Sequence, residues 1–289
     1  MKFAVFILLI MLAAAQAPAD LLARFRTADG DIVVQLYEHE KPVTVANFVR
    51  LTEAGAYTNN FFHRCIPGFV VQGGGFATAN PANTNLFLSY IPAPNFGAIT
   101  NEYGVGRLYS NYYGTIAMAK VAGNPDSATS QWFFNLADNS DILDSDNNGG
   151  FTVFGRVVSG INVLQAFNSM SMSNGIVDLT QFYGPGASTF STLPVRYSGH
   201  TAPHYNELIY VNIQILHAPS LALTGGGSAI TWEGATGLTN HLEASDTLLP
   251  ESWLPVFTTL ATTSPVTATV TNPSDSTKFY RIRVEVPPE

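Results

Sequence analysis

Cysteine and charged residues are both scarce in this chain. Its 289 residues include one cysteine, Cys65, so no disulfide bond can form within the chain. Cys65 stands beside Ile66 in an apolar run, which favours a small buried side chain over a reactive thiol. Lys and Arg number 13, and the formal net charge is -8. Because nucleic acids and anionic membranes both require clustered cations, we expect the chain to bind neither.

Long apolar runs and the common catalytic motifs are missing as well. Beyond the N-terminus no uninterrupted apolar run approaches about 18 residues, so we expect no membrane span. The chain has no G-x-S-x-G motif, its six histidines are scattered, and Gly73–Gly75 lacks the surroundings of a phosphate-binding loop. We therefore expect no metal ion and no other cofactor.

One stretch imitates a metal site. Asp144–Gly149 matches the opening D-x-[DN]-x-[DN]-G of a calcium-binding loop. The twelfth position of that loop would be Gly155, where a bidentate Glu belongs, and residues 151–155 have the pattern of a strand. A solvated turn is favoured, and calcium stays the minor alternative.

The N-terminus has the pattern of a secretory signal peptide over residues 1–19. Lys2 precedes an apolar run that ends at Ala15, and small residues follow. Cleavage after any of three alanines fits this pattern: Ala15, Ala17 or Ala19. A buried N-terminal strand is the alternative, which the pattern disfavours. The sequence therefore predicts export to the periplasm, the cell surface or the medium.

The remainder is rich enough in apolar residues, at 46% of the chain, to bury a core. Two β-rich runs on either side of Asp29-Gly30 predict a hairpin, and a helix is predicted over 42–51, with Val45 and Phe48 on one face. Further predicted elements are strands in 61–76, 114–120, 130–136, 151–158 and 207–216, and a short helix at 161–168. Such a series predicts a mainly β fold, a closed antiparallel barrel with a helix or two at its ends.

Two segments, 77–113 and 169–206, read as long surface loops. After Pro219 the composition changes, and short β-rich runs alternate with turns. The predicted domains are a signal peptide at 1–19, a barrel domain at 20–218, a Gly-rich linker at 219–228 and a small β-sandwich-like domain at 229–289. Trp232 and Trp253 are expected in the core of the last domain rather than stacked on a sugar.

The run 61–76 carries the strongest signal for function. Arg64 and Gln72 share strand parity, so both face one side if the turn at Pro67-Gly68 keeps the register. They would offer hydrogen-bond donors on an apolar surface, without a nucleophile or an acid–base pair. This combination favours a binding or conformational chemistry over hydrolysis.

Several blocks of the chain, taken together, resemble the cyclophilin family of peptidyl-prolyl cis-trans isomerases in order and spacing. The blocks are FHR at 62–64, IPGF at 66–69, QGGGF at 72–76, GTIAMA at 114–119, SATSQWFF at 127–134 and FTVFGRV at 151–157. The resemblance covers about residues 21–217 and is closest to bacterial exported forms. It implies a closed eight-stranded antiparallel barrel capped by two helices, with proline-containing peptides and unfolded exported proteins as partners. Nothing in the sequence demands more than a monomer.

The resemblance also implies an activity, rotation about X-Pro bonds, with Arg64 as the donor to the amide nitrogen and Gln72 as the partner of the substrate carbonyl. The remaining residues carried over by the resemblance are Phe69, Val70, Phe133, Leu143 and Phe151 around the proline ring, Ala119, Lys120 and Gln131 beside the chain, and His63 and Phe62 behind the site. The alternative is a non-catalytic proline-peptide-binding or chaperone module, anchored to a surface or glycan by the C-terminal domain. The presence of both Arg64 and Gln72 favours the enzyme.

Three positions depart from the usual family pattern. Val70 stands where Met is common, Lys120 where Asn is common, and Phe151 where a His or another aromatic residue is found. These changes predict a roomier pocket that binds cyclosporin-type macrocycles more weakly than is usual in the family. Trp132 replaces a usual Phe and is expected to pack inside the barrel.

Overall fold

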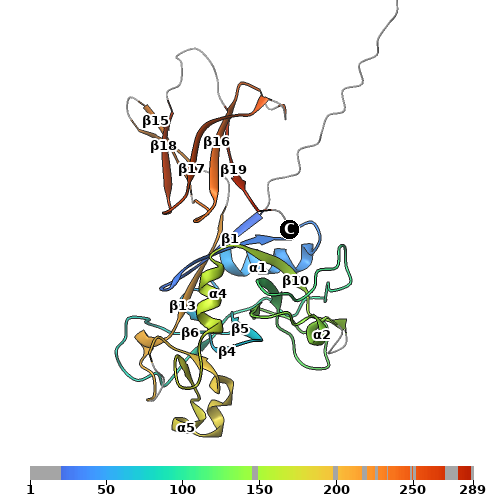
Figure 1. The fold of residues 1–289 in the computed structure, drawn as a ribbon, viewed down its shortest axis with the longest axis vertical. Helices are drawn as coiled ribbons and strands as arrows, with labels where there is room; N and C mark the ends of the chain where they lie inside the picture. Colours follow the sequence, from blue (N-terminus) through green and yellow to red (C-terminus); the bar gives the residue numbers. More distant parts are fainter. Residues whose placement is uncertain are drawn as a thin grey trace, which may run out of the picture.

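The structure is a computed structural model. It describes residues 21–144, 149–197, 201–216, 220–224, 227–232, 234–247, 249, 252–270 and 279–287. The signal peptide expected at 1–19 lies outside the described residues, as does most of the calcium-like stretch Asp144–Gly149. Figure 1 shows a larger body that ends with β13 and, beyond it, a smaller body built from strands.

The larger body is mainly β, as the sequence predicts. Eleven of its described strands form one antiparallel sheet, and β11 and β12 form a separate pair. In ladder order they are β4 (Arg64–Ile66), β5 (Val70–Gly73), β9 (Trp132–Asn135), β8 (Thr115–Met118), β10 (Val153–Ser159), β2 (Gly30–Leu36), β1 (Leu21–Thr27), β13 (Tyr210–Leu216), β3 (Asn60–Phe61), β6 (Phe76–Ala77) and β7 (Ile91–Pro92). The hairpin predicted at Asp29-Gly30 joins β1 to β2.

The sheet curls because one stretch of chain takes part in both ends of the ladder. β3 pairs with β13 and β4 pairs with β5, and only Phe62 and His63 separate β3 from β4. The Phe62 amide donates to Ile209 O, and the His63 amide donates to Gln72 O, each at 3.0 Å. The expected strand count of eight therefore differs from the structure, in which this strand is interrupted and β6 and β7 extend the sheet.

Two helices pack on the curled sheet. α1 (Pro42–Glu53) and α4 (Ile161–Asn168) begin and end close to the predicted positions. The residues that they place in the main core are Val45, Phe48 and Leu51 from α1, and Val163, Leu164 and Phe167 from α4. Trp132 lies fully buried among them, with its ring edge-on to Phe62 at 5.5 Å between centroids. These two helices match the predicted caps.

The two segments read as surface loops are more ordered than expected. The second contains β11 (Ile176–Val177), β12 (Leu193–Pro194), α5 (Thr180–Tyr183) and two 3-10 helices, η1 (Pro185–Phe190) and η2 (Tyr205–Glu207). Phe87 of the first segment and Phe190 of the second meet in a separate apolar cluster, 5.6 Å apart, over Phe61. The segments therefore share a core that neither could form alone. The short helix α2 (Ser140–Leu143) lies elsewhere, before the calcium-like stretch.

In its described residues the smaller body consists of two three-stranded sheets. One is β14 (Ser220–Thr224), β15 (Gly227–Trp232) and β18 (Val266–Val270), and the other is β17 (Leu254–Leu260), β16 (Thr239–Ser245) and β19 (Phe279–Glu285). Trp232 is buried with Leu242 of the facing sheet, as predicted, whereas Trp253 is half-buried beneath the Arg281 guanidinium. Where the chain is described, much of the linker predicted at 219–228 is strand, since β14 pairs with β15.

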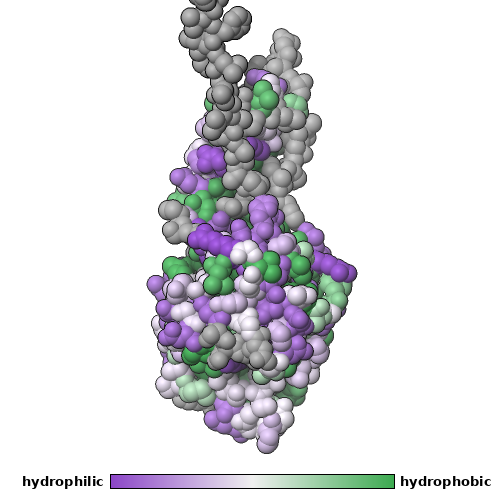
Figure 2. All heavy atoms as spheres, turned by 90° about the vertical axis from the view of Figure 1, so that its right-hand side faces the viewer, coloured by the Kyte–Doolittle hydropathy of each residue, from purple (hydrophilic) through white to green (hydrophobic). Residues whose placement is uncertain are grey.

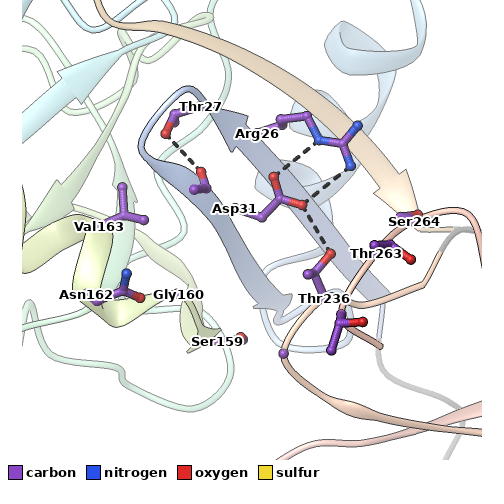
Figure 3. A pocket seen from close by; sticks show the side chains of 13 residues that line it. Arg26, Thr27, Asp31, Ser159, Gly160, Asn162, Val163, Thr236, Thr263 and Ser264 are labelled. Atoms are coloured by element: carbon purple, nitrogen blue, oxygen red, sulfur yellow. Dashed lines mark hydrogen bonds and ion pairs between the residues drawn. The ribbon is translucent and has the colours of Figure 1, made fainter. Parts of the chain in front are cut away.

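The two bodies meet at the β1–β2 hairpin. Leu22 and Val33 pack there against Ala235 and Leu238 of the smaller body. Figure 3 shows the polar side of this junction, where the Asp31 carboxylate accepts hydrogen bonds from Arg26 Nε at 3.2 Å and Thr236 Oγ1 at 3.1 Å. An open cleft of about 560 Å³ lies beside these residues.

The surface carries no large apolar face on the side drawn in Figure 2, where hydrophilic and hydrophobic residues are interspersed over the larger body. No helix in the described part of the chain has the length and apolar character needed to cross a membrane. Among those same residues, His, Cys, Asp and Glu side chains do not gather in threes or more at any place that could hold a metal ion.

Candidate active site

The β4–β5 hairpin brings Arg64 and Gln72 together. The two residues are direct partners in the antiparallel ladder, so the parity argument from the sequence holds. The turn between the strands uses Gly68 at φ +74°, a conformation that glycine adopts without strain. Asn168, at the end of α4, accepts a hydrogen bond from the Gly68 amide at 2.6 Å. The helix therefore fixes the turn that sets the register.

A row of partnered residues crosses the sheet from this hairpin. Gln72 is paired with Phe133 on β9, and Phe133 is paired with Ala117 on β8. Side chains of directly paired residues lie on the same face of a sheet. The row thus places the polar pair next to an aromatic ring on one face, while Phe134, one residue along β9, turns into the main core.

The polar groups form a short chain of hydrogen bonds. Arg64 Nη1 donates to Gln72 Oε1 at 3.4 Å, and Gln72 Nε2 donates to Gln131 Oε1 at 2.7 Å. Burial lowers the pKa of the half-buried Arg64 guanidinium, which nevertheless stays charged because arginine titrates far above neutral pH. The site therefore presents one positive, multi-donor group that is oriented by neutral amides.

An apolar cluster separate from the main core lies on the same face. It contains five of the predicted pocket residues together with Ala119: Phe69, Val70, Phe133, Leu143 and Phe151. The Phe133 and Phe151 rings meet edge to face at 5.7 Å, and the Arg64 guanidinium carbon lies 5.9 Å from the Phe69 ring centroid. The structure thus unites the residues that the sequence analysis placed around the proline ring.

Lys120 and Gln131 border this cluster at Phe151 and at Gln72 respectively. The Ala119 amide donates to Gln131 O at 2.9 Å, which holds residues 119–120 beside β9. The Lys120 ammonium donates to Gly150 O at 2.5 Å and lies 4.9 Å from the Phe151 ring centroid. Burial lowers the pKa of Lys120, and the charge of Asp126 opposes that shift. The Lys120 side chain is therefore directed at the Phe151 wall.

Behind the site, Phe62 and His63 are packed residues. Phe62 lies in the main core against Trp132 and Phe167. Burial and the neighbouring Arg64 charge lower the pKa of His63 to about 3, against a weaker opposing effect of its hydrogen bond with Gln131. The imidazole is neutral at physiological pH and offers no proton for transfer, which agrees with the packed role expected for it.

Sequence reasoning missed a buried amide network that supports the pocket. Asn135, the ladder partner of Val70, donates to Asn111 Oδ1 at 3.1 Å. Asn139 donates to Phe69 O at 2.8 Å and to Asn135 Oδ1 at 2.7 Å. These bonds hold the segment that leads into α2 and Leu143. The available signal was a polar residue, Asn135, directly after the apolar run of β9.

Comparison with known proteins agrees with this arrangement. The family model for cyclophilin type peptidyl-prolyl cis-trans isomerase/CLD matches residues 22–181. The chain is 37% identical over 163 residues to a peptidyl-prolyl cis-trans isomerase of Acinetobacter baylyi, covering 56% of this chain and 80% of that protein. It is 35% identical over 161 residues to peptidyl-prolyl cis-trans isomerase B of Escherichia coli, covering 52% and 85%.

A solved structure shows a looser likeness. A cyclophilin type peptidyl-prolyl cis-trans isomerase of Cryptosporidium parvum overlaps this chain with a TM-score of 0.43 at 20% identity, over 68% of this chain and 99% of that one.

Proposed function

We propose that this chain, which belongs to the cyclophilin-type family and is a peptidyl-prolyl cis-trans isomerase, works through Arg64 and serves proteins outside the cytoplasm. Isomerisation requires rotation about the amide bond before proline, and resonance opposes that rotation by roughly 18–20 kcal/mol in a peptide bond. Bonds of this kind exchange slowly enough to delay folding. An enzyme accelerates the exchange by binding the twisted amide better than either planar isomer.

Arg64 supplies that preference in the proposed mechanism. When the amide twists, its nitrogen lone pair is no longer delocalised, and a fixed N–H donor directed at it stabilises the transition state electrostatically. The donor needs no reorganisation, because Gln72 already orients the guanidinium. The reaction forms no covalent intermediate and moves no proton, which is consistent with a neutral His63 beside the site.

One observation carries this proposal, the ladder row Arg64, Gln72 and Phe133. It sets a cation within reach of an apolar cluster that suits a proline ring, and it leaves the Gln72 and Gln131 amides to contact a substrate carbonyl and the flanking chain. The cluster excludes water from one side of the guanidinium, and a lower local dielectric strengthens its effect on the twisted nitrogen.

The test of the mechanism is the variant Arg64→Ala assayed on a short proline-containing peptide. Loss of one preorganised donor is expected to lower kcat/KM by roughly 10²–10³-fold. Arg50→Ala is the matched control, because Arg50 is an exposed arginine on α1 that stacks on Phe96. Equal turnover by the Arg64→Ala variant and the wild type would remove Arg64 from the mechanism.

The proposed clients are unfolded exported proteins that contain proline. Support comes from the sequence, in which Lys2 and the apolar run to Ala15 have the pattern of a secretory signal. The enzyme would then act as a monomer in the periplasm, at the cell surface or in the medium. Contact of the C-terminal domain with a surface or glycan stays a prediction.

Export makes a measurable prediction about the N-terminus. Mass spectrometry of the protein from culture medium and from cell fractions should find a mature chain that begins after Ala15, Ala17 or Ala19. Recovery of the intact N-terminus from the cytoplasmic fraction alone would contradict the proposed localisation.

A further inference from the structure

A second apolar cavity lies outside the isomerase site, between the two long segments of the larger body. Its volume is about 280 Å³. One wall is Phe87, Leu88 and Tyr90 from the first segment, and the other is Leu179, Tyr183 and Phe190 from the second. Ligand pockets commonly measure about 300–1,000 Å³, so this cavity suits one or two side chains rather than a cofactor.

The rim of this cavity exposes large apolar side chains. Leu88 is 72% exposed, and Tyr90 and Tyr183 are 45% and 39% exposed. Leu86, Ile91 and Phe182, their close neighbours in the chain, are also largely exposed. Apolar side chains gathered around a hollow on the surface mark a binding site more often than chance exposure does.

Packed aromatic rings connect the cavity to the isomerase site. The His63 ring, next to Arg64, meets the Phe76 ring at 4.9 Å. Phe76 in turn meets Tyr90 at 4.8 Å and Phe190 at 5.2 Å. Two ring contacts, His63–Phe76 and Phe76–Tyr90, therefore lead from the residue next to Arg64 to the cavity wall.

A second connection runs along the backbone. The Ala93 amide, just after β7, donates to Gly75 O at 2.8 Å. A Cβ atom at Gly75 would lie 2.9 Å from the Gln131 side chain, which itself bonds to Gln72. The segment 90–93 thus borders the amides that would flank a bound substrate.

We propose that this cavity is a second subsite, which binds one large apolar side chain of the same unfolded polypeptide whose prolyl bond lies at Arg64. The inference rests on the proposed function and deepens it. The ring steps from His63 to Phe76 and from Phe76 to Tyr90 measure 4.9 Å and 4.8 Å between centroids. An extended chain advances about 3.3 Å per residue, so the bound side chain would stand at least roughly three residues from the proline.

The walls favour an aromatic side chain. Phe190 already meets Phe76, Phe87 and Tyr90 in edge-to-face contacts at 5.1–5.6 Å, a geometry that another ring can extend. An unfolded client is also the occupant that this connection to the isomerase site favours. The smaller body is not the occupant, because it packs on β1 and β2, whereas α5, which carries the cavity residue Tyr183, lies at the far end of the molecule (Figure 1).

The experiment compares three substrates with the full mature chain: a tetrapeptide that contains proline, a longer peptide that extends the same core with a phenylalanine about five residues away, and the same longer peptide with serine in place of phenylalanine. Burial of a phenylalanine should give the second peptide an affinity roughly tenfold or more above that of the third. The variant Leu88→Glu should abolish that advantage, because a carboxylate at the rim opposes apolar burial.

Controls separate the subsite from general effects. Leu254→Glu changes a residue that is 67% exposed on the smaller body, and it should keep the advantage. Tetrapeptide turnover should be the same in Leu88→Glu and the wild type, which shows that the isomerase site remains folded. Arg64→Ala should retain the binding advantage while kcat/KM falls roughly 10²–10³-fold, so failure of the mechanism and failure of the subsite are distinguishable.

Three outcomes would overturn the subsite. The wild type could bind the phenylalanine and serine peptides equally, or the advantage could survive in Leu88→Glu. Sedimentation could also show that the wild type forms a dimer that Leu88→Glu dissociates, in which case the occupant is a second copy of the chain.

Discussion

At the residue scale, Arg64 and His63 are neighbours with opposite surroundings. Arg64 begins β4 and reaches the apolar cluster that carries Phe69, whereas His63, in the short break before β4, lies buried against Phe76. One is a permanent cation and the other a neutral ring at physiological pH. A single step along the chain therefore separates the charge needed at the site from a group that must stay uncharged.

His63 predicts a specific dependence of stability on pH. Its pKa falls from 6.5 in the unfolded chain to about 3 in the folded protein, so only the unfolded state binds this proton between those values. Folding stability contributed by His63 is complete above about pH 6.5 and is lost as the pH falls towards 3, at up to about 1.4 kcal/mol per pH unit.

The measurement is urea unfolding of the wild type and of His63→Leu from pH 7 to pH 4. The free energy of unfolding of the variant should fall less steeply as the pH is lowered through this range. The titration of carboxylates contributes equally to both proteins and therefore cancels in the difference. Parallel curves would show that burial does not lower the pKa of His63 in the folded protein.

At the element scale, β5 has a glycine where β9 places its largest side chain, Trp132. Gly73 and Trp132 are ladder partners, and a Cβ atom at Gly73 would lie 2.6 Å from the Trp132 ring. The large indole at a position where a smaller ring is usual is thus accommodated by a residue without a side chain. The run Gly73–Gly75 is explained by close contacts of this kind.

Gly73→Ala should therefore destabilise the fold. The added methyl group must displace Trp132 inside a packed core, which is expected to cost about 1–3 kcal/mol of unfolding free energy. Gly104→Ala is the matched control, because no atom lies within 4 Å of a Cβ atom there. Thermal denaturation followed by tryptophan fluorescence measures both variants, and equal midpoints would contradict the packing argument.

At the scale of the whole molecule, two bodies share one apolar junction. Leu22 and Val33 of the larger body are buried partly by Ala235 and Leu238, and Thr236 bonds to Asp31 at the edge (Figure 3). This contact lies on β1 and β2, whereas Arg64 stands on β4. The smaller body thus supports the sheet at a distance from the isomerase site.

Removal of residues 217–289 should distinguish a contribution of the smaller body to stability from a contribution to catalysis. The truncated chain exposes the apolar side chains of the junction, so its melting temperature should fall and its binding of a hydrophobic dye should rise. Turnover of a proline-containing tetrapeptide at 25 °C should stay close to that of the full chain. Loss of turnover in a truncated chain that remains folded would show that the smaller body takes part in catalysis.

Much of the fold was predictable because its signals are local. The hairpin at Asp29-Gly30, the helix with Val45 and Phe48 on one face, and the shared parity of Arg64 and Gln72 each depend on residues close together in the chain. The strand Ser220–Thr224, within the predicted linker, lacks such a local signal. Its glycine-rich neighbours hide the strand, which exists because β15 pairs with it.

The sequence by itself determined the family, the mainly β class and the polar pair at the site, because strand periodicity and turn preferences depend on residues that are adjacent in the chain. Only the tertiary structure decided that Phe87 and Phe190 close a separate core and a cavity beside that site. Phe87 and Phe190 meet only after the chain has folded, because burial of apolar surface depends on neighbours in space that no local pattern specifies.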